Sequence, residues 1–219
     1  MQQVLIIGLG QFGRALATSL SSKGVEVLAV DHRNELVEDI APLVADAATL
    51  DATDEEALAR LQPDKRDVSI CAIGEDSKEA AIICTALLRQ LGAPKVIARA
   101  ASVVLKRILT LVGAHEVYSP EEEFGNRLAN RIALRNIISD MPLGGEIHAA
   151  EFAIPESFVD KTLVELELPK RFGVMVVAVR HVNKAHTMDL PDPKAKLQEG
   201  DQLVVVSKEA AIAKLLQES

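Results

Sequence analysis

The sequence predicts an α/β protein, a Rossmann-like doubly wound parallel sheet followed by a small α+β lobe. Apolar runs of strand length alternate with helical patterns from residue 3 to residue 118, as expected for a parallel sheet covered on both faces. A glycine-rich turn at residues 8–13 joins the first apolar run to the first helix. Beyond residue 145 the strands and helices are shorter, and prolines and turn residues interrupt them.

The first lobe contains six predicted strands separated by helices. The strands are expected at residues 3–7, 26–30, 44–49, 68–73, 96–99 and 116–118. The helices are expected at residues 12–22, 35–41, 55–61, 78–91 and 103–112. A glycine follows three of these helices, where a left-handed cap suits it: Gly24, Gly92 and Gly113.

A further helix is predicted from Pro120 to about residue 139. Proline suits a first helical turn, and the acids Glu121, Glu122 and Glu123 interact favourably with the helix dipole there. No strand remains for this helix to cover. Its apolar face is therefore expected to meet a partner subunit or the second lobe.

Residues 141–145, Met-Pro-Leu-Gly-Gly, break the helical pattern and predict a linker. The expected domains are thus residues 1–140, including the last helix, and residues 146–219. In the second domain, strands are expected at 147–154, 174–180 and 202–207, and helices at 162–166 and 209–216.

The composition excludes several classes of protein. The 219 residues are 48% hydrophobic and 26% charged, which is enough for a folded core. The formal net charge of −8 argues against nucleic-acid binding, because polyanions repel an acidic surface. The apolar runs are too short to span a bilayer, and no signal peptide is expected. Cys71 and Cys84 are expected to be buried free thiols in a reducing cytosol, so a cytoplasmic protein is predicted.

The turn after the first strand has the GxGxxG pattern of nucleotide-binding folds: Gly8, Leu9, Gly10, Gln11, Phe12 and Gly13. Glycine lets the backbone approach a pyrophosphate closely, and the next helix offers unpaired N–H groups to the anion. Asp31 ends the second strand, 18 residues after Gly13, where a carboxylate binds ribose hydroxyls. Strand, turn, helix, strand and acid in this order predict an adenine-nucleotide site.

Further motifs follow one another along nearly the whole chain. In the first lobe they are IIGLGQFG (6–13), VLAVD (27–31), DATD (51–54), AIG (72–74), VIAR (96–99) and GAHEVYSPE (113–121). The second lobe adds KTL (161–163), GV (173–174) and LQEGD (197–201). With these motifs the chain resembles the RCK-domain, TrkA/KtrA-like, cytosolic regulatory subunits of bacterial Trk and Ktr potassium transporters.

The resemblance implies a regulatory subunit rather than an enzyme, with no catalytic residues. It implies a homodimer that assembles into a higher-order ring, usually an octamer. The ring would lie at the inner face of the cell membrane, peripheral to it, beneath an integral-membrane potassium-translocating subunit. Exchange of an adenine nucleotide, ATP or ADP, would change the shape of the ring and gate that partner.

The resemblance also assigns roles at the ends of the strands. Asp31 would bind both ribose hydroxyls and would disfavour a 2′-phosphate, although His32 and Arg33 soften that repulsion. Next to the adenine would lie three residues that follow the third strand: Asp51, Ala52 and Thr53. Asp51 or Thr53 as the cap of the following helix is the alternative interpretation.

The fourth and fifth strands contribute the remaining predicted binding residues. Small residues at the end of the fourth strand let a base or phosphate approach, and the predicted set is Ala72, Ile73, Gly74 and Glu75. Arg99 ends the fifth strand as a candidate ligand-binding residue or intersubunit cation. A plain surface arginine is the alternative.

Gln11 departs from the family pattern, which commonly has an arginine that reaches the terminal phosphate of a neighbouring subunit's ATP. A neutral glutamine makes no charge-assisted fork to a phosphate. Discrimination between ATP and ADP is then expected to be weak, or the ligand is AMP or NAD(H). Arg14, in the first turn of the helix, is the residue that would compensate.

Glu121 matches a family acid that helps to bind a divalent cation, Mg²⁺ or Ca²⁺, at the dimer interface. An ordinary acid at a helix N-terminus is the alternative. In some relatives the second lobe binds cyclic di-AMP between two subunits, and Arg171, Phe172 and residues 174–177 lie in the matching region. An apolar strand paired across a dimer explains this region equally well.

Two other functions compete with that of a potassium-transport regulator. The same fold serves NAD-dependent oxidoreductases and redox sensors. An oxidoreductase needs a positioned acid or base, but the tyrosine-lysine pair of such enzymes is missing, because Glu122 stands four residues after the single tyrosine, Tyr118. A ligand-binding regulator of a cation antiporter is the third hypothesis, and the sequence separates it poorly from the first.

Overall fold

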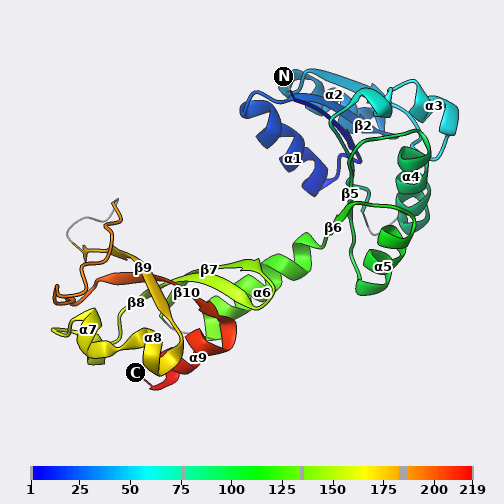
Figure 1. The fold of residues 1–219 in the computed structure, drawn as a ribbon. Coiled ribbons are helices and arrows are strands. Elements are labelled where there is room, and N and C mark those ends of the chain that lie inside the picture. The colour runs from blue at the N-terminus through cyan, green and yellow to red at the C-terminus, as the bar shows by residue number, and fades with distance from the viewer. Residues whose placement is uncertain (1, 75–76, 134–135, 183–186, 219) are drawn as a thin grey trace. The chain divides into compact units, whose positions relative to one another are not determined.

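The structure, a computed structural model, describes residues 2–74, 77–133, 136–182 and 187–218 (Figure 1). The chain divides into two compact units, Met1–Glu122 and Glu123–Ser219, here called the N-terminal unit and the C-terminal unit. Within the described ranges, no helix has the length and apolarity that crossing a membrane requires.

The N-terminal unit is built on a six-stranded sheet with the order β3-β2-β1-β4-β5-β6. All of its neighbouring strands pair in parallel. The strands are β1 (Gln3–Ile7), β2 (Glu26–Asp31), β3 (Asp46–Thr49), β4 (Val68–Cys71), β5 (Val96–Arg99) and β6 (Glu116–Tyr118). This order confirms the predicted Rossmann-like doubly wound sheet.

Helices cover both faces of this sheet (Figure 1). They are α1 (Gln11–Ser22), α2 (Asn34–Ile40), α3 (Glu55–Ala59), α4 (Lys78–Gln90) and α5 (Val103–Leu111), with short 3-10 turns at Ala41–Leu43 and Pro63–Lys65. Alternate residues of each strand face opposite sides. Val4 and Ile6 therefore pack with α1 and α2, whereas Leu5 and Ile7 pack with the helices of the other face.

The face covered by α3, α4 and α5 holds a core of buried residues that includes both cysteines. Cys71 and Cys84 are fully buried free thiols in this cluster, as expected from the sequence. The predicted strand boundaries differ slightly, because β4 ends at Cys71 instead of residue 73 and β3 begins at Asp46 instead of residue 44. Residues 72–74 are thus loop, and they lie against the glycine-rich turn.

The C-terminal unit contains a four-stranded antiparallel sheet with the order β7-β8-β10-β9. Its elements are α6 (Pro120–Ala133, which begins in the N-terminal unit), β7 (Ile137–Gly144), β8 (Ile147–Ala153), a 3-10 turn at Glu156–Phe158, α7 (Leu163–Leu166), α8 (Leu168–Phe172), β9 (Met175–Arg180), β10 (Gln202–Lys208) and α9 (Glu209–Glu218). Phe152 and Leu203 are fully buried in its core. The small α+β lobe is confirmed.

Two predictions for the start of this unit are wrong. The helix was expected to reach residue 139, but α6 ends at Ala133 and Ile137 begins a strand. The expected linker, residues 141–145, instead forms the end of β7 and the turn into β8. Gly144 and Gly145 both have positive φ, and two glycines between strands favour a tight hairpin. Pro142 is accommodated because β7 is an edge strand.

Candidate functional site: a cavity at the carboxyl edge of the parallel sheet

A cavity of about 720 Å³ lies at the carboxyl ends of the strands of the N-terminal unit. The strand order reverses between β1 and β4, and open α/β sheets bind ligands at such a point. The cavity is lined by most of the residues predicted for the nucleotide site: Gly8, Gly10, Gln11, Asp31, His32, Arg33, Asp51, Ala52, Thr53, Ala72, Ile73, Gly74 and Arg99. The structure thus brings together residues from five separate strand ends.

The glycine-rich turn is closely packed at two of its three glycines. Gly8 has φ +98°, and a Cβ atom there would lie 2.8 Å from the backbone nitrogen of Ile73. A Cβ on Gly13 would lie 1.8 Å from the Gly8 carbonyl oxygen. A Cβ on Gly10 would meet no atom within 4 Å, and Gly10 lines the cavity. Gly8 and Gly13 therefore shape the turn, whereas Gly10 leaves space for a ligand.

The N-termini of two helices belong to the cavity wall. Gly10 precedes α1 and Ser77 precedes α4, and both lack a side-chain capping bond. The first N–H groups of a helix have no intrahelical acceptor and attract anions. No acidic residue occupies the first turn of α1. This end of the cavity therefore suits a phosphate group.

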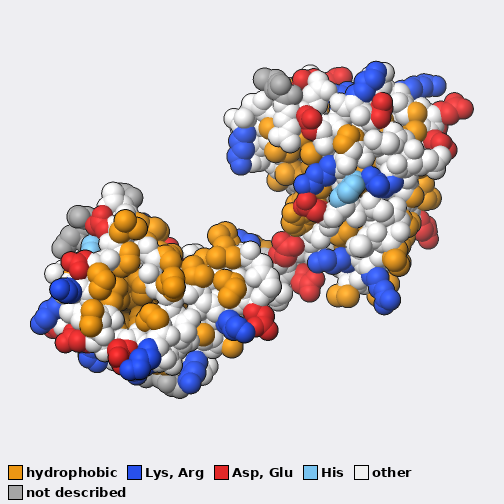
Figure 2. Space-filling view, viewed as in Figure 1, with side chains coloured by type: hydrophobic (Ala, Val, Ile, Leu, Met, Phe, Trp, Pro, Cys, Tyr) orange, Lys and Arg blue, Asp and Glu red, His pale blue; other side chains and the backbone are white. Residues whose placement is uncertain are grey.

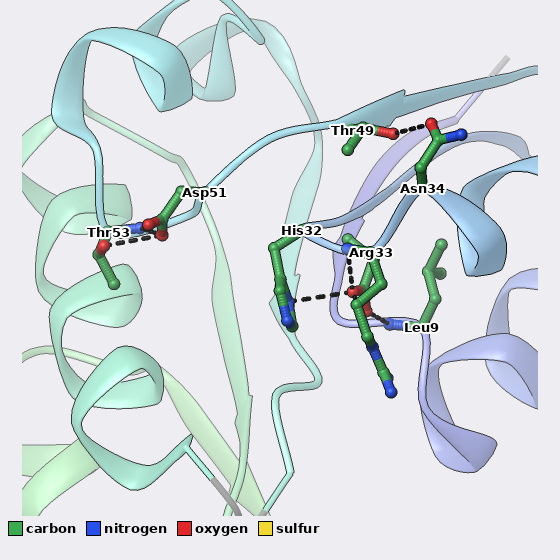
Figure 3. Close-up of polar contacts among 8 residues, drawn as sticks. Leu9, His32, Arg33, Asn34, Thr49, Asp51 and Thr53 are labelled. Carbon is green, nitrogen blue, oxygen red and sulfur yellow. Dashed lines mark hydrogen bonds and ion pairs between the residues drawn. The ribbon is translucent and has the colours of Figure 1, made fainter.

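Asp31 ties the glycine-rich turn to the end of β2. Figure 3 labels its partners Leu9, His32 and Arg33. The Asp31 side chain is 5% exposed. Its Oδ2 atom accepts a hydrogen bond of 2.7 Å from the Leu9 N–H, and its Oδ1 atom accepts one of 2.9 Å from the Arg33 N–H. The His32 Nδ1 atom and the Arg33 Nε atom lie 3.1 and 3.5 Å from Oδ1. The carboxylate thus holds the turn in place, and Oδ2, which accepts from Leu9 alone among the described residues, keeps a lone pair for a ribose hydroxyl.

Asp51 forms a local turn after β3 instead of a helix cap. Its Oδ1 atom accepts hydrogen bonds from the Thr53 N–H, at 2.9 Å, and from the Thr53 hydroxyl, at 2.7 Å (Figure 3). These bonds, with the nearby His32, hold the pKa of Asp51 below its ordinary value of 3.8. The cap of α3 is Asp54, whose carboxylate accepts from the Glu56 and Ala57 N–H groups. The capping alternative for Asp51 and Thr53 is therefore wrong.

Arg99 stands where the polar cavity meets an apolar groove, and it lines both. Its side chain is 17% exposed, and its guanidinium carbon lies 5.7 Å from the centre of the Phe12 ring. Its Nη2 atom donates to the Glu121 carboxylate. A plain surface arginine is therefore the wrong interpretation.

Several predicted residues do not line the cavity with their side chains. Leu9 is buried in the core beneath α1 and contributes only its N–H. Phe12 lines the apolar groove, and Gly13 is buried in α1. Glu75 lies outside the described residues. Arg14, considered as a substitute for the missing arginine, forms an ion pair with Asp39 at 3.0 Å and does not line the cavity.

Sequence reasoning missed four cavity residues, Ile7, Leu50, Ser77 and Ala80. Ser77 carried a usable signal, because a serine directly before a helical pattern at the end of a strand marks a helix N-terminus at the ligand edge. Glu121 does not line the cavity, but its carboxylate accepts a hydrogen bond from Arg99, which does. No three His, Cys, Asp or Glu side chains gather into a metal-binding cluster in the described part of the chain.

The fold and the cavity define a class of protein, the Rossmann-like nucleotide-binding domains that carry a small second lobe. The sequence matches the TrkA-N domain over residues 4–120 and the TrkA-C domain over residues 149–218. The chain belongs to this family of TrkA-type RCK proteins, which confirms the resemblance found in its motifs.

Named relatives match across both units of the chain. It is 32% identical to the Ktr system potassium uptake protein A of Vibrio alginolyticus over 98% of this chain and 96% of the relative. It is 30% identical to the Ktr system potassium uptake protein C of Bacillus subtilis (strain 168), over 82% of this chain and 80% of the relative.

Solved structures share the fold across both units. The GsuK channel superposes with a TM-score of 0.70 at 20% identity, over 98% of this chain and 38% of the channel chain. The same channel bound to NAD gives a TM-score of 0.68 at 19% identity, again over 98% and 38%. This chain therefore spans well under half of the channel chain.

Proposed function

We propose that this chain is the nucleotide-binding regulatory subunit of a membrane potassium transport system. The observation that carries the proposal is the cavity at the switch point of the sheet, which combines the glycine-rich turn, two uncapped helix N-termini and Asp31. Two relatives that the chain matches over 96% and 80% of their length are named potassium uptake proteins.

The ligand is an adenine nucleotide, ATP or ADP in the first place. Gln11 lines the cavity as a neutral side chain, so the preference for a third phosphate is weak and AMP or NAD(H) compete for the same site. GsuK structures are described as bound to NAD and to ADP. The basic side chains that line the cavity are His32, Arg33 and Arg99.

The regulatory role needs a partner and an assembly. The partner is an integral-membrane potassium-translocating subunit, so the chain acts in the cytoplasm, peripheral to the inner face of the membrane. The assembly is a homodimer that builds a ring, with an octamer as the expected size. Exposed apolar side chains favour such contacts, for example Val103, Val104 and Leu111 on α5.

The C-terminal unit offers a second surface for self-association. β9 is an edge strand, and its Met175 and Val177 side chains are exposed. Figure 2 shows hydrophobic side chains gathered on the visible face of this unit. Val179 of β9 pairs with Asp189, whereas the apolar edge at Met175 and Val177 is exposed and favours pairing with a second copy. We favour this explanation of the region over cyclic di-AMP binding.

A divalent cation, Mg²⁺ or Ca²⁺, is proposed to bind Glu121 from two subunits. One chain supplies a single carboxylate there, so the second subunit and the nucleotide phosphates complete the oxygen ligands that such cations prefer. Glu121→Gln then removes the cation dependence of nucleotide affinity while the nucleotide still binds.

The test is calorimetric titration of the purified chain with ATP, ADP, AMP, NADH and cyclic di-AMP, each with EDTA, Mg²⁺ or Ca²⁺. Micromolar binding of ATP or ADP that a divalent cation alters supports the proposal. Binding of NADH alone would move the assignment to redox sensing and call for an enzyme assay. Failure of every adenine nucleotide to bind refutes the nucleotide-sensing role.

A further inference from the structure

Arg99 is the one cationic side chain of the cavity that is also engaged outside it, among the residues that the structure describes. It ends β5 and lines the cavity, while its Nη2 atom donates to Glu121 in the first turn of α6. Both residues belong to the N-terminal unit, which ends at Glu122. From there α6 continues into the C-terminal unit.

The guanidinium of Arg99 is held in place, but not all of its N–H groups have a hydrogen-bond acceptor among the described residues. Its carbon atom lies 5.7 Å from the centre of the Phe12 ring, a distance at which a cation and an aromatic ring attract. A Cβ atom on Gly74 would lie 3.4 Å from Nη1. The buried Nε atom has no hydrogen-bond partner within the described ranges. A buried, charged N–H without an acceptor is unfavourable, so Arg99 is ready to receive an anion.

Arg99 can bind Glu121 or a phosphate in the cavity, and the bond to Glu121 is the weaker of the two. The Glu121 side chain is 60% exposed, and an ion pair with one exposed partner contributes little. A phosphate in the cavity offers more oxygen atoms and more charge, and arginine binds such groups with two parallel hydrogen bonds. A single positive charge shared between two anions holds each of them less tightly.

We infer that Arg99 is shared between Glu121 and the phosphate groups of a bound nucleotide, so that ligand binding weakens the Arg99–Glu121 ion pair and loosens the first turn of α6. This inference rests on the proposed nucleotide site and adds the residue pair through which that site acts. Glu121 competes with the ligand for Arg99. The coupling is reciprocal, so holding Glu121 on Arg99 opposes nucleotide binding by the same factor.

The affinity test uses four proteins, namely the parent chain, Arg99→Met, Glu121→Gln and the double variant, titrated with adenosine, AMP and ADP in EDTA. EDTA removes any effect of a cation at Glu121. Arg99→Met is expected to weaken ADP binding about 10- to 100-fold, as for the loss of hydrogen bonds to a charged group. It is expected to weaken adenosine binding less than about twofold, because adenosine has no phosphate. Glu121→Gln is expected to tighten ADP about two- to fivefold, and this gain is lost in the double variant.

Two further variants and a second measurement separate competition from a structural effect. Glu122→Gln, one residue along α6, removes the same charge without touching Arg99 and is expected to leave ADP affinity unchanged. Arg99→Lys keeps the charge and is expected to recover part of the loss. Amide hydrogen exchange over residues 120–128 is expected to rise when ADP binds the parent chain and to stay constant in Arg99→Met.

The outcomes distinguish this inference from the proposed function. Two outcomes would refute the sharing of Arg99 while the nucleotide site stands, provided that ADP binds the parent chain. In the first, Glu121→Gln changes ADP affinity by the same factor with and without Arg99. In the second, ADP does not change the amide exchange of residues 120–128. If no adenine nucleotide binds the parent chain, the proposed function fails, and the inference fails with it.

Discussion

Replacing Asp31 by alanine is the change that tests the site most directly. The carboxylate accepts hydrogen bonds of 2.7 and 2.9 Å from the Leu9 and Arg33 N–H groups, and in the proposed site it also accepts from the ribose. Each hydrogen bond to a charged group contributes about 1.5–3 kcal/mol. Loss of even one ribose contact is therefore expected to weaken the binding of AMP and ADP about 10- to 150-fold.

The same substitution also affects the empty protein. The contact between Leu9 and Asp31 is buried, and a buried N–H left without an acceptor costs about 1–3 kcal/mol. A lower free energy of unfolding is therefore expected, and the glycine-rich turn loses its tie to β2. Weaker nucleotide binding has two sources, lost ribose contacts and a less ordered turn.

Calorimetry with AMP and its 2′,3′-dideoxy analogue separates these sources. If Asp31 binds the hydroxyl groups, Asp31→Ala weakens AMP far more than the dideoxy compound. If Asp31 only orders the turn, both ligands weaken equally. Asp39→Ala, which removes an exposed carboxylate paired with Arg14, is the matched control for net charge. Equal affinity of the parent chain and Asp31→Ala for AMP would refute the assignment of the site.

Three further predictions concern the turn, the carboxylate after β3 and the second core. Gly13→Ala is expected to lower the melting temperature, because its Cβ atom would lie 1.8 Å from the Gly8 carbonyl oxygen. Gly10→Ala should leave the melting temperature unchanged and weaken nucleotide binding. Equal melting temperatures of the two variants would contradict this. The depressed pKa of Asp51 means that its bonds to Thr53 stabilise the fold above about pH 3.8 and are lost as the pH falls through the lowered pKa. Thr53→Val should therefore move the carboxyl titration of Asp51 upward in ¹³C NMR, and an unmoved midpoint would show that the hydroxyl bond is unimportant. Phe152→Ala, at a fully buried position, should lower the free energy of unfolding of the C-terminal unit by about 3–5 kcal/mol in denaturant titration; a loss below about 1 kcal/mol would mean that Phe152 is not packed as described.

Local sequence patterns were sufficient for most of the N-terminal unit. The six strands and five helices follow from apolar runs, helical periodicity and glycine caps, because each element is short and, apart from β3 and β4, strands that follow one another along the chain are neighbours in the sheet. The edge at which strand ends gather follows from the parallel topology alone. For this reason most of the predicted binding residues were found on one cavity.

The wrong predictions concern segments whose local sequence pattern is compatible with two different structures. Residues 137–144 contain apolar positions that suit a helix, and Pro142 with Gly144 and Gly145 suits a linker. Pairing with β8 decides otherwise, since the strand pairs antiparallel with β8 from Ile137 to Gly144, with irregular register on either side of residues 139–142. Likewise Asp51 and Asp54 both have cap chemistry, and only the backbone path shows that Asp54 caps α3.

The sequence by itself determined the fold class, the family and the nucleotide edge of the sheet, because these depend on periodicity and on short motifs that act within a few residues. Only the tertiary structure decided how the side chains at that edge are used. Asp31 is tied to Leu9 across 22 residues of chain, and Arg99 contacts Glu121 across another 22. Contacts between distant segments depend on the packing of the whole unit, so no local pattern specifies them.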